Sequence, residues 1–440
     1  MTNLLRVLYL LGSAYRRLYW DEKRLKRFQE KRLRQVVRYA YDFVPFYHRR
    51  FKEAGVNPLS IKKTEDLCRL PIIKKDEFKK QDPREIVSRE FDCSRLKKVR
   101  TSGSTGKPFQ VHISGREDDW RKAIYMRANI ACGQRPRDRW VVMTSAHHFH
   151  DTTGIQRRLG IYSQTCISLF EPTEQKIDKI AAVKPDVLDG YSGSLFLLSK
   201  AIKRRGLGTI RPRIMFGSAE SIDLKSRRYM ENVFGAPFCD QFGAAEVDRS
   251  AWQCLERQGY HMDIDSAITE FVDEAGDNVG DGENGEIMFT SLFSFAMPFI
   301  RYAIGDIGAP SGGSCPCGRT LPLMKVVEGR KDSFLTLPGN RIMSPMMFNY
   351  VMSTFKYYAA VDQYRIRQRR IDYFEVALKM VGSSFDEREV ASEFVTHVRK
   401  FLNAGGSELR FDVSFVNEIP LSPTGKLMSV SSDLKAKIED

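Results

Sequence analysis

Hydroxyl and glycine residues are concentrated in one short segment that could bind a phosphate chain. Its residues are Thr101, Ser102, Gly103, Ser104, Thr105, Gly106 and Lys107, followed by Pro108. Glycine lets backbone N–H groups turn toward an anion, and N–H groups and hydroxyls together form an anion nest to which the lysine adds charge. Two residues separate the glycines, so the segment does not match the GxxxxGK[ST] loop. A flexible surface loop would have the same composition.

Two later segments place an acidic residue where a nucleotide could be held. In Asp240-Gln241-Phe242-Gly243-Ala244-Ala245-Glu246, the ring could lie on a base and the last carboxylate could bind a metal. In Arg301-Tyr302-Ala303-Ile304-Gly305-Asp306, a carboxylate after a glycine turn could accept both hydroxyl groups of a ribose. The structural alternatives are an ordinary strand end with a turn, and an aspartate that caps its own backbone.

Four thiol and imidazole groups have a spacing that suits zinc. Cys254 and His261 are separated by six residues, and Cys315 and Cys317 by one. Together they supply four ligands of the types found in tetrahedral zinc sites. Four protein ligands leave no open position, so the ion would be structural and would pin a β-rich segment beside Asp306. Reduced, buried cysteines are the alternative.

Two polar segments near the end of the chain are ambiguous by themselves. Gly329-Arg330-Lys331-Asp332 could be a surface ion pair, and Leu421-Ser422-Pro423-Thr424-Gly425-Lys426 places a lysine on a tight turn. A lysine on such a turn is usually just exposed to solvent.

In this order, the segments resemble the motifs of the adenylate-forming superfamily, which includes acyl-CoA synthetases, luciferases and nonribosomal adenylation domains. The resemblance is to the branch of phenylacetate–CoA ligase, CapK-like proteins and coenzyme F390 synthetase, and it extends from Val44-Pro45-Phe46-Tyr47 to Lys426. It implies an enzyme that uses ATP and Mg²⁺ to activate a carboxylic acid as an acyl-adenylate and transfers the acyl group to CoA. An amine or alcohol acceptor, in polysaccharide or cofactor modification, is the alternative within this branch.

The resemblance also implies a role for each matching residue. Phosphates would be held by Thr101–Lys107, and Mg²⁺ in part by Glu246. Adenine would lie beside the turn Ser218, Ala219 and Glu220, which also borders the acyl pocket, and beside Gln241, Phe242 and Gly243. Asp306 would bind ribose, Arg330 would contact ribose or phosphate, Asp332 would be the hinge, and Lys426 would stabilise charge between carboxylate and α-phosphate. Similar Cys and His positions in relatives favour structural zinc at Cys254, His261, Cys315 and Cys317.

Two positions depart from the pattern of the superfamily. Phe242 lacks the usual hydroxyl, and Ala245 lacks the hydroxyl that ordinarily contacts the α-phosphate. These departures keep a non-catalytic nucleotide-binding scaffold open as an alternative, although backbone donors could compensate. Lys426 and Glu246 argue for the enzyme.

The basic character of the chain concerns its partners rather than its fold. The formal net charge is +15, and the excess is concentrated near the N-terminus. A solvated helix face explains this charge most simply, and without a nucleic-acid motif we expect no nucleic-acid partner. The apolar stripe Leu5, Leu8, Leu11 and Tyr15 could form a peripheral membrane contact, but packing against the protein is the simpler interpretation. We recognise no secretory signal and expect a cytoplasmic protein.

The remaining pattern predicts the elements that must position these groups. Residues 1–95 form a helical lead-in, and strand-like runs then alternate with helical runs, as in a parallel sheet covered by helices. Short strands with Gly and Asp turns indicate a β-rich subdomain over residues 262–328. We therefore predict an α/β protein with a large ATP- and acyl-binding domain, residues 1–330, and a small mobile α+β domain, residues 333–440.

Overall fold

The computed structural model describes residues 3–100, 109–145, 152–330, 334–343, 345–382, 385–402, 409–422 and 425–434. The chain forms two compact units, Met1–Gln134 with Cys239–Val327 and Arg135–Phe238 with Glu328–Asp440. The predicted boundary between residues 330 and 333 is of a different kind, because it marks where the C-terminal domain is expected to move. It stays a prediction. The predicted phosphate loop at 101–107 and the predicted hinge Asp332 lie outside the described residues.

The first unit begins with helices. They are α1 (Leu4–Arg17), α2 (Glu22–Phe43), α3 (Pro45–Glu53), α4 (Lys75–Lys79), α5 (Pro83–Ile86) and α6 (Gly115–Ala131). The buried face of α2 carries Leu25, Leu33, Val36 and Ala40. Val44 has extended backbone angles and separates α2 from α3, because the proline that follows disfavours helical geometry at this residue.

Helix α1 turns an apolar side toward solvent. Its buried residues are Val7, Ala14 and Arg17, whereas Leu5, Leu8 and Tyr9 are 81%, 51% and 76% exposed. The expectation that the stripe of Leu5, Leu8, Leu11 and Tyr15 packs against the protein is therefore wrong for Leu5 and Leu8. The physical reason is a charge: the buried Arg17 guanidinium pairs with Asp265 at 2.5 Å, which fixes the rotation of the helix.

The strands of the first unit are mostly antiparallel. They are β1 (Ile73–Lys74), β2 (Lys97–Arg100), β3 (Gln110–Ile113), β8 (Phe238–Ala244), β9 (Asp248–Gln253), β10 (Tyr260–Met262), β11 (Ala267–Val272), β12 (Gly285–Ser291), β13 (Tyr302–Ser311) and β14 (Leu323–Arg330). Strands β8 to β10 precede the predicted β-rich segment. Strands β11, β12 and β13 pair in succession, and the parallel pair β1–β13 brings Lys74 beside Ala303.

The second unit contains the parallel sheet that alternation of strands and helices predicts. Its strands are β4 (Trp140–Thr144), β5 (Gln164–Ser168), β6 (Val187–Tyr191) and β7 (Ile214–Ser218), in the order β5-β4-β6-β7. The intervening helices are α7 (Gly154–Leu159), α8 (Thr173–Val183), α9 (Ser192–Arg204) and α10 (Leu224–Phe234). Apolar side chains of these strands and of α8, α9 and α10 share one core. The predicted α/β class is thus confirmed.

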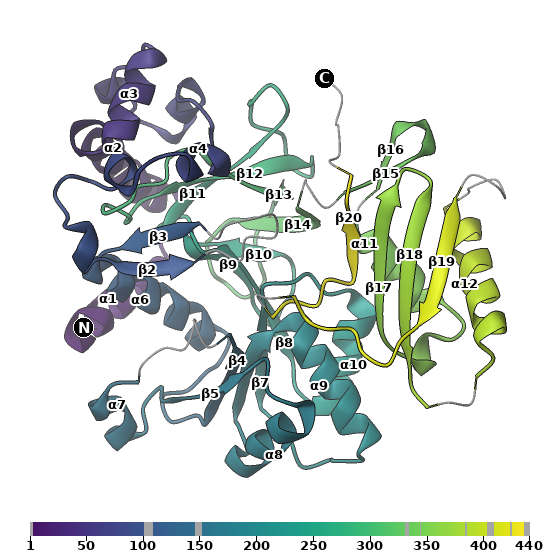
Figure 1. The fold of residues 1–440 in the computed structure, drawn as a ribbon. Coiled ribbons are helices and arrows are strands. Elements are labelled where there is room, and N and C mark those ends of the chain that lie inside the picture. The colour runs from purple at the N-terminus through teal and green to yellow at the C-terminus, as the bar shows by residue number, and fades with distance from the viewer. Residues whose placement is uncertain are drawn as a thin grey trace. The chain divides into compact units, whose positions relative to one another are not determined.

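The C-terminal part of the second unit is a small α+β layer (Figure 1). It comprises β15 (Leu335–Leu337), β16 (Arg341–Met343), α11 (Pro345–Thr354), β17 (Val361–Arg370), β18 (Tyr373–Met380), α12 (Glu387–Phe401), β19 (Arg410–Phe415) and β20 (Val430–Ser432). Four strands form a sheet in the order β19-β18-β17-β20. Parallel pairing of β17 with β20 places the chain just after Lys426 beside this sheet.

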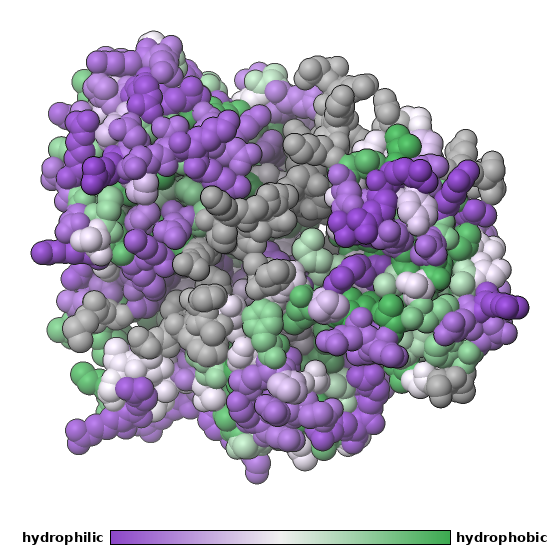
Figure 2. All heavy atoms as spheres, in the orientation of Figure 1, coloured by the Kyte–Doolittle hydropathy of each residue, from purple (hydrophilic) through white to green (hydrophobic). Residues whose placement is uncertain are grey.

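The surface of the N-terminal helices is mainly polar, as Figure 2 shows where α2 and α3 lie. Basic side chains dominate the solvent side of α2, among them Lys23, Arg27 and Arg34. None of the described helices combines the length and the apolar character that crossing a bilayer would require.

Candidate functional site

A buried carboxylate with two side-chain partners lies just after β8. The Glu246 side chain is 5% exposed, and its Oε1 atom lies 3.1 Å from Lys75 Nζ. The same oxygen accepts a hydrogen bond of 3.0 Å from the hydroxyl of Tyr302. A buried carboxylate is costly unless it is paired, and the ammonium and the phenol provide the partners here. Because carboxylates ligate Mg²⁺, this residue could exchange its protein cation for a metal ion.

The backbone that carries Glu246 is held from α6. The Arg121 guanidinium donates to the carbonyl oxygens of Ala245 at 2.9 Å and of Glu246 at 2.8 Å. Arg121 is itself fixed by a buried ion pair with Glu117, N–O distance 2.8 Å. Ala245, the residue at which the superfamily pattern has a hydroxyl, therefore lies in a turn whose backbone is held by two hydrogen bonds from one guanidinium.

The residues predicted to meet adenine and ribose lie on β8 and β13. Phe242 is half-buried against the core of this unit. Gly243 must be glycine, because a Cβ atom there would lie 2.3 Å from the Asp248 carbonyl oxygen. Asp306 is half-buried and follows Gly305, whose φ of 83° favours glycine. The Gln241 amide donates to Asn129 at 2.8 Å, so it is engaged within the protein.

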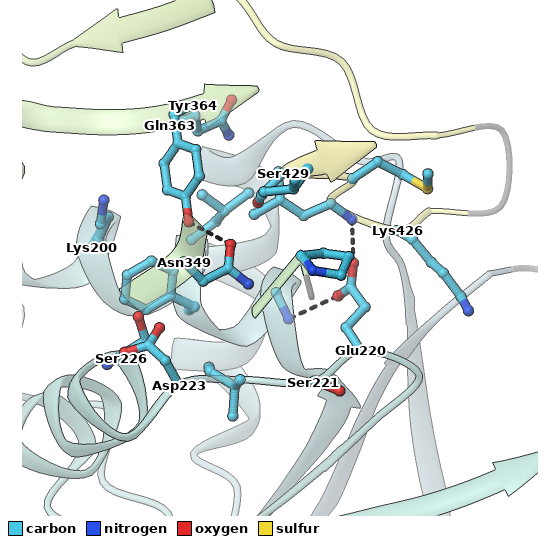
Figure 3. A pocket seen from close by; sticks show the side chains of 18 of the residues that line it. Lys200, Glu220, Ser221, Asp223, Ser226, Asn349, Gln363, Tyr364, Lys426 and Ser429 are labelled. Carbon is cyan, nitrogen blue, oxygen red and sulfur yellow. Dashed lines mark hydrogen bonds between the residues drawn. The ribbon is translucent and has the colours of Figure 1, made fainter. Parts of the chain in front are cut away.

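In the second unit, the turn after β7 reaches the Lys426 segment. Ala219 has a φ of 69°, an uncommon conformation for a residue with a side chain, and separates Ser218 from Glu220. The Glu220 carboxylate accepts hydrogen bonds from the backbone N–H groups of Leu427 and Gly193, the latter at 2.9 Å (Figure 3). Burial raises the pKa of Glu220 to about 7, against the lowering effect of the two backbone donors and of Lys426. Its predicted contact with the nucleotide stays a prediction.

The four predicted zinc ligands form one cluster. The ligand atoms of Cys254, His261, Cys315 and Cys317 all lie within 4.8 Å of one another. Cys254 Sγ is 3.5 Å from Cys315 Sγ, and Cys317 Sγ is 3.4 Å from His261 Nε2. Burial lowers the pKa of His261 to about 4, so the imidazole is neutral, as a ligand must be. The donor set and its geometry fit a closed tetrahedral zinc site.

Sequence analysis did not identify three of these contacts. Lys75 and Arg121 lie far from Glu246 in the sequence, and no local pattern joins them. Tyr302 stands inside the Asp306 motif, and β13 brings its hydroxyl to Glu246. The backbone of Arg330 ends β14, but the structure does not describe its side chain.

Comparison with known proteins identifies relatives along nearly the whole chain. No protein-family model matches it. Phenylacetate–coenzyme A ligase of Thermus thermophilus is 28% identical over an alignment of 440 positions, which covers 93% of this chain and 96% of that protein. Protein CapK of Staphylococcus aureus is 23% identical, with coverage of 97% and 94%.

Solved structures show the same fold. A crystal structure of 2-hydroxyisobutyryl-CoA ligase in the postadenylation state, in complex with 2-HIB-AMP, matches with a TM-score of 0.79. It is 22% identical, and the match covers 95% of this chain and 91% of that chain. Together with the motifs and their order, these findings show that the chain is similar along nearly its whole length to proteins of the phenylacetate–CoA ligase and CapK-like branch of the adenylate-forming superfamily.

Proposed function

We propose that this protein is an AMP-forming acid–CoA ligase. The observation that carries the proposal is the match to phenylacetate–CoA ligase along 96% of that relative's length. The buried Glu246–Lys75–Tyr302 group supports it, because an enzyme of this kind must hold a cation beside a polyphosphate. The protein would take ATP, a carboxylic acid and CoA, and would release AMP and pyrophosphate.

The reaction has two steps whose atoms balance. First, a carboxylate oxygen of the acid bonds to the α-phosphorus of ATP, and the bond from that phosphorus to the β-phosphate oxygen breaks. Second, the thiol sulfur of CoA bonds to the acyl carbon, the thiol proton is lost, and AMP leaves with the carboxylate oxygen. Positioning and electrostatic stabilisation supply most of the catalysis in such transfers.

Charged residues of this chain would divide the first step between them. Glu246 would hold Mg²⁺, which when bound neutralises charge on the phosphates. Lys75 would then be released from Glu246 to meet a phosphate oxygen, since its ammonium already lies 3.1 Å from that carboxylate. Lys426 would stabilise the charge between the carboxylate and the α-phosphate. Asp306 would accept the ribose hydroxyls, and Phe242 would lie against adenine.

The Cys/His cluster would be a structural zinc site. Its four ligand atoms already lie within 4.8 Å of one another, and a closed four-ligand site leaves no position for a substrate. We expect one equivalent of zinc in the purified protein by atomic emission, and a content far below one equivalent would refute the assignment.

Exchange of labelled pyrophosphate into ATP tests the activity directly. We expect exchange that depends on one class of carboxylic acid within a broad panel, followed by thioester formation when CoA is added. A protein that binds ATP but supports no exchange with any acid would be the nucleotide-binding scaffold instead. Exchange without thioester formation, but with acyl transfer to an amine or alcohol, would identify the alternative acceptor.

We also propose that α1 contacts an anionic membrane surface. Leu5, Leu8 and Tyr9 expose an apolar side of the helix, which could insert at a membrane surface. Residues 1–63 contain 16 basic and five acidic residues, a net charge of +11. Such a segment attracts anionic lipid and would repel a second copy of itself.

Co-sedimentation with vesicles tests this contact. Binding to vesicles that contain phosphatidylserine, with little binding to neutral vesicles and loss of binding in Leu5→Ser with Leu8→Ser, is the expected result. Equal binding to both vesicles, no binding, or self-association of the protein in solution would contradict the proposal.

A further inference from the structure

The turn that carries Lys426 is held in shape by its own hydrogen bonds. The Ser422 N–H donates to the Lys426 carbonyl oxygen at 2.9 Å, and the Gly425 N–H donates to the Ser422 carbonyl oxygen at 2.8 Å. The Lys426 N–H donates to Ser422 Oγ at 3.0 Å. Gly425 has a φ of 83°, and a Cβ atom there would lie 2.6 Å from Leu169 Cδ1. These hydrogen bonds join Ser422 to Gly425 and Lys426.

The Glu220 carboxylate fastens this turn to the first turn of α9. One oxygen accepts from the N–H of Leu427, the residue after the lysine, and the other accepts from the N–H of Gly193 (Figure 3). A Cβ atom at Gly193 would lie 2.6 Å from Glu220 Oε2 and 3.0 Å from Leu427 Cβ. Only glycine therefore allows α9, the carboxylate and the lysine-bearing segment to approach this closely.

A cavity beside this contact leaves fewer atoms to pack against the C-terminal segment. A cavity of about 230 Å³ is lined by residues of α9, the loop after β7, α11, β17 and the segment 426–430 (Figure 3). Atoms that face a cavity lose van der Waals partners. The polar contacts beside the cavity therefore take part in holding the C-terminal segment.

A second group of contacts lies on the other side of the cavity. Lys200 Nζ donates to the carbonyl oxygens of Val361 at 2.8 Å and Asp362 at 2.7 Å. The Arg204 guanidinium pairs with the Asp362 carboxylate at 3.0 Å. These contacts fix the start of β17 to α9, whereas the Glu220 contact acts at the residue next to Lys426.

We propose that Glu220 is a positioning residue for adenylation, which places Lys426 by holding the backbone of Leu427. This inference rests on the proposed function, because the role of Lys426 belongs to that proposal. The alternative is direct contact of Glu220 with the nucleotide. Each carboxylate oxygen already accepts one backbone hydrogen bond, so the carboxylate is oriented by the protein backbone, and an added contact with a nucleotide would have to use the remaining lone pairs.

A double-mutant cycle separates these two roles, because a residue that acts through Lys426 has no effect once the lysine is absent. The variants are Glu220→Ala, Lys426→Ala and the double variant, with Asp178→Ala as a control that removes an exposed carboxylate of α8. Two rates are measured: pyrophosphate exchange, which reports adenylation, and thioester formation from supplied acyl-AMP and CoA.

We expect Glu220→Ala to slow pyrophosphate exchange by about 10- to 100-fold, as misplacement of a catalytic group does. Thioester formation from acyl-AMP should change by less than about threefold, and Glu220→Gln, which keeps one acceptor, should lose less exchange. In the Lys426→Ala background, Glu220→Ala should cause no further loss. Losses that multiply in the double variant, or equal losses in both steps, would overturn the proposal.

Hydrogen exchange at the Leu427 amide gives a readout that does not require activity. We expect faster exchange of peptides containing Leu427 in Glu220→Ala, with unchanged exchange of β18 peptides and no change in Asp178→Ala. Unchanged protection of Leu427 would refute the anchor even in an active enzyme. Faster exchange in a protein without adenylation activity would retain the anchor and refute the proposed function.

Discussion

Two glutamates, the buried Glu246 in one compact unit and the half-buried Glu220 in the other, show how partners decide what a carboxylate can do. Glu246 has a side-chain ammonium at 3.1 Å and a phenol at 3.0 Å. Glu220 has two backbone N–H groups, from Gly193 and Leu427. A partner on a flexible side chain can be exchanged for a metal ion, whereas two backbone partners fix one segment against another. The first carboxylate therefore suits a ligand, and the second suits an anchor.

The largest effect is expected at Glu246. Glu246→Gln should slow adenylation by roughly 100-fold, because one charge that holds a cation at the phosphates is lost. The Mg²⁺ concentration needed for half-maximal rate should rise, whereas Glu274→Gln, at an exposed site, should change neither quantity. An unchanged Mg²⁺ dependence in Glu246→Gln would show that this carboxylate does not bind the metal.

Removal of the ammonium tests the other half of the same pair. Lys75→Met should slow adenylation by about 10-fold and lower the free energy of unfolding of the ligand-free protein by about 1–3 kcal/mol, since Glu246 is left buried without its cation. Added Mg²⁺ should recover more stability in Lys75→Met than in the wild type. Equal recovery in urea unfolding would mean that the metal and the lysine do not share Glu246.

The pH dependence of stability should distinguish the second glutamate. The folded-state pKa of Glu220 is about 7, above the ordinary value of 4.5. Its contribution to stability is therefore full below pH 4.5 and is lost as the pH rises through 7. Between pH 6 and 8, the wild type should lose about 1 kcal/mol of unfolding free energy that Glu220→Gln does not lose. Parallel curves in urea unfolding would argue against this burial.

The smallest effect on catalysis is expected at the Cys/His cluster. Cys317→Ser should lower the zinc content and the thermal midpoint, because structural zinc contributes to folding. Adenylation per folded molecule at low temperature should change by less than about threefold. A loss of adenylation as large as that of Glu246→Gln would mean that the cluster takes part in the reaction.

Local patterns in the sequence predict the elements and the motif residues, but not the partners that complete them. Glu246 follows from its motif, whereas its partner Lys75 lies in a separate helix, α4, and the β1–β13 pairing helps to bring that segment alongside. Similarly, the motif assigns Glu220 to the nucleotide, and nothing in the sequence indicates that Gly193 and Leu427 each donate to one of its oxygens. Contacts between distant residues are fixed by strand pairing and packing.

The orientation of α1 illustrates the same limit. Helical spacing predicts a stripe of apolar residues, but it cannot tell which side of the helix is buried. The side that carries Arg17 is buried because its guanidinium meets Asp265, whose second partner is the buried Arg127 at 2.7 Å. The buried side also carries Val7 and Ala14, so an ion-pair network from three distant segments and a second set of apolar residues together set the rotation of the helix.

The oxygen atoms of the substrate's carboxylate provide the most direct test that the acid is activated as an acyl-adenylate. A carboxylic acid that supports exchange is labelled with oxygen-18 in both carboxylate oxygens and turned over with ATP and CoA, and the products are analysed by mass spectrometry. An acyl-adenylate route transfers one labelled oxygen to AMP and none to pyrophosphate. Unlabelled AMP, or label in inorganic phosphate or pyrophosphate, would contradict activation of the acid as an acyl-adenylate.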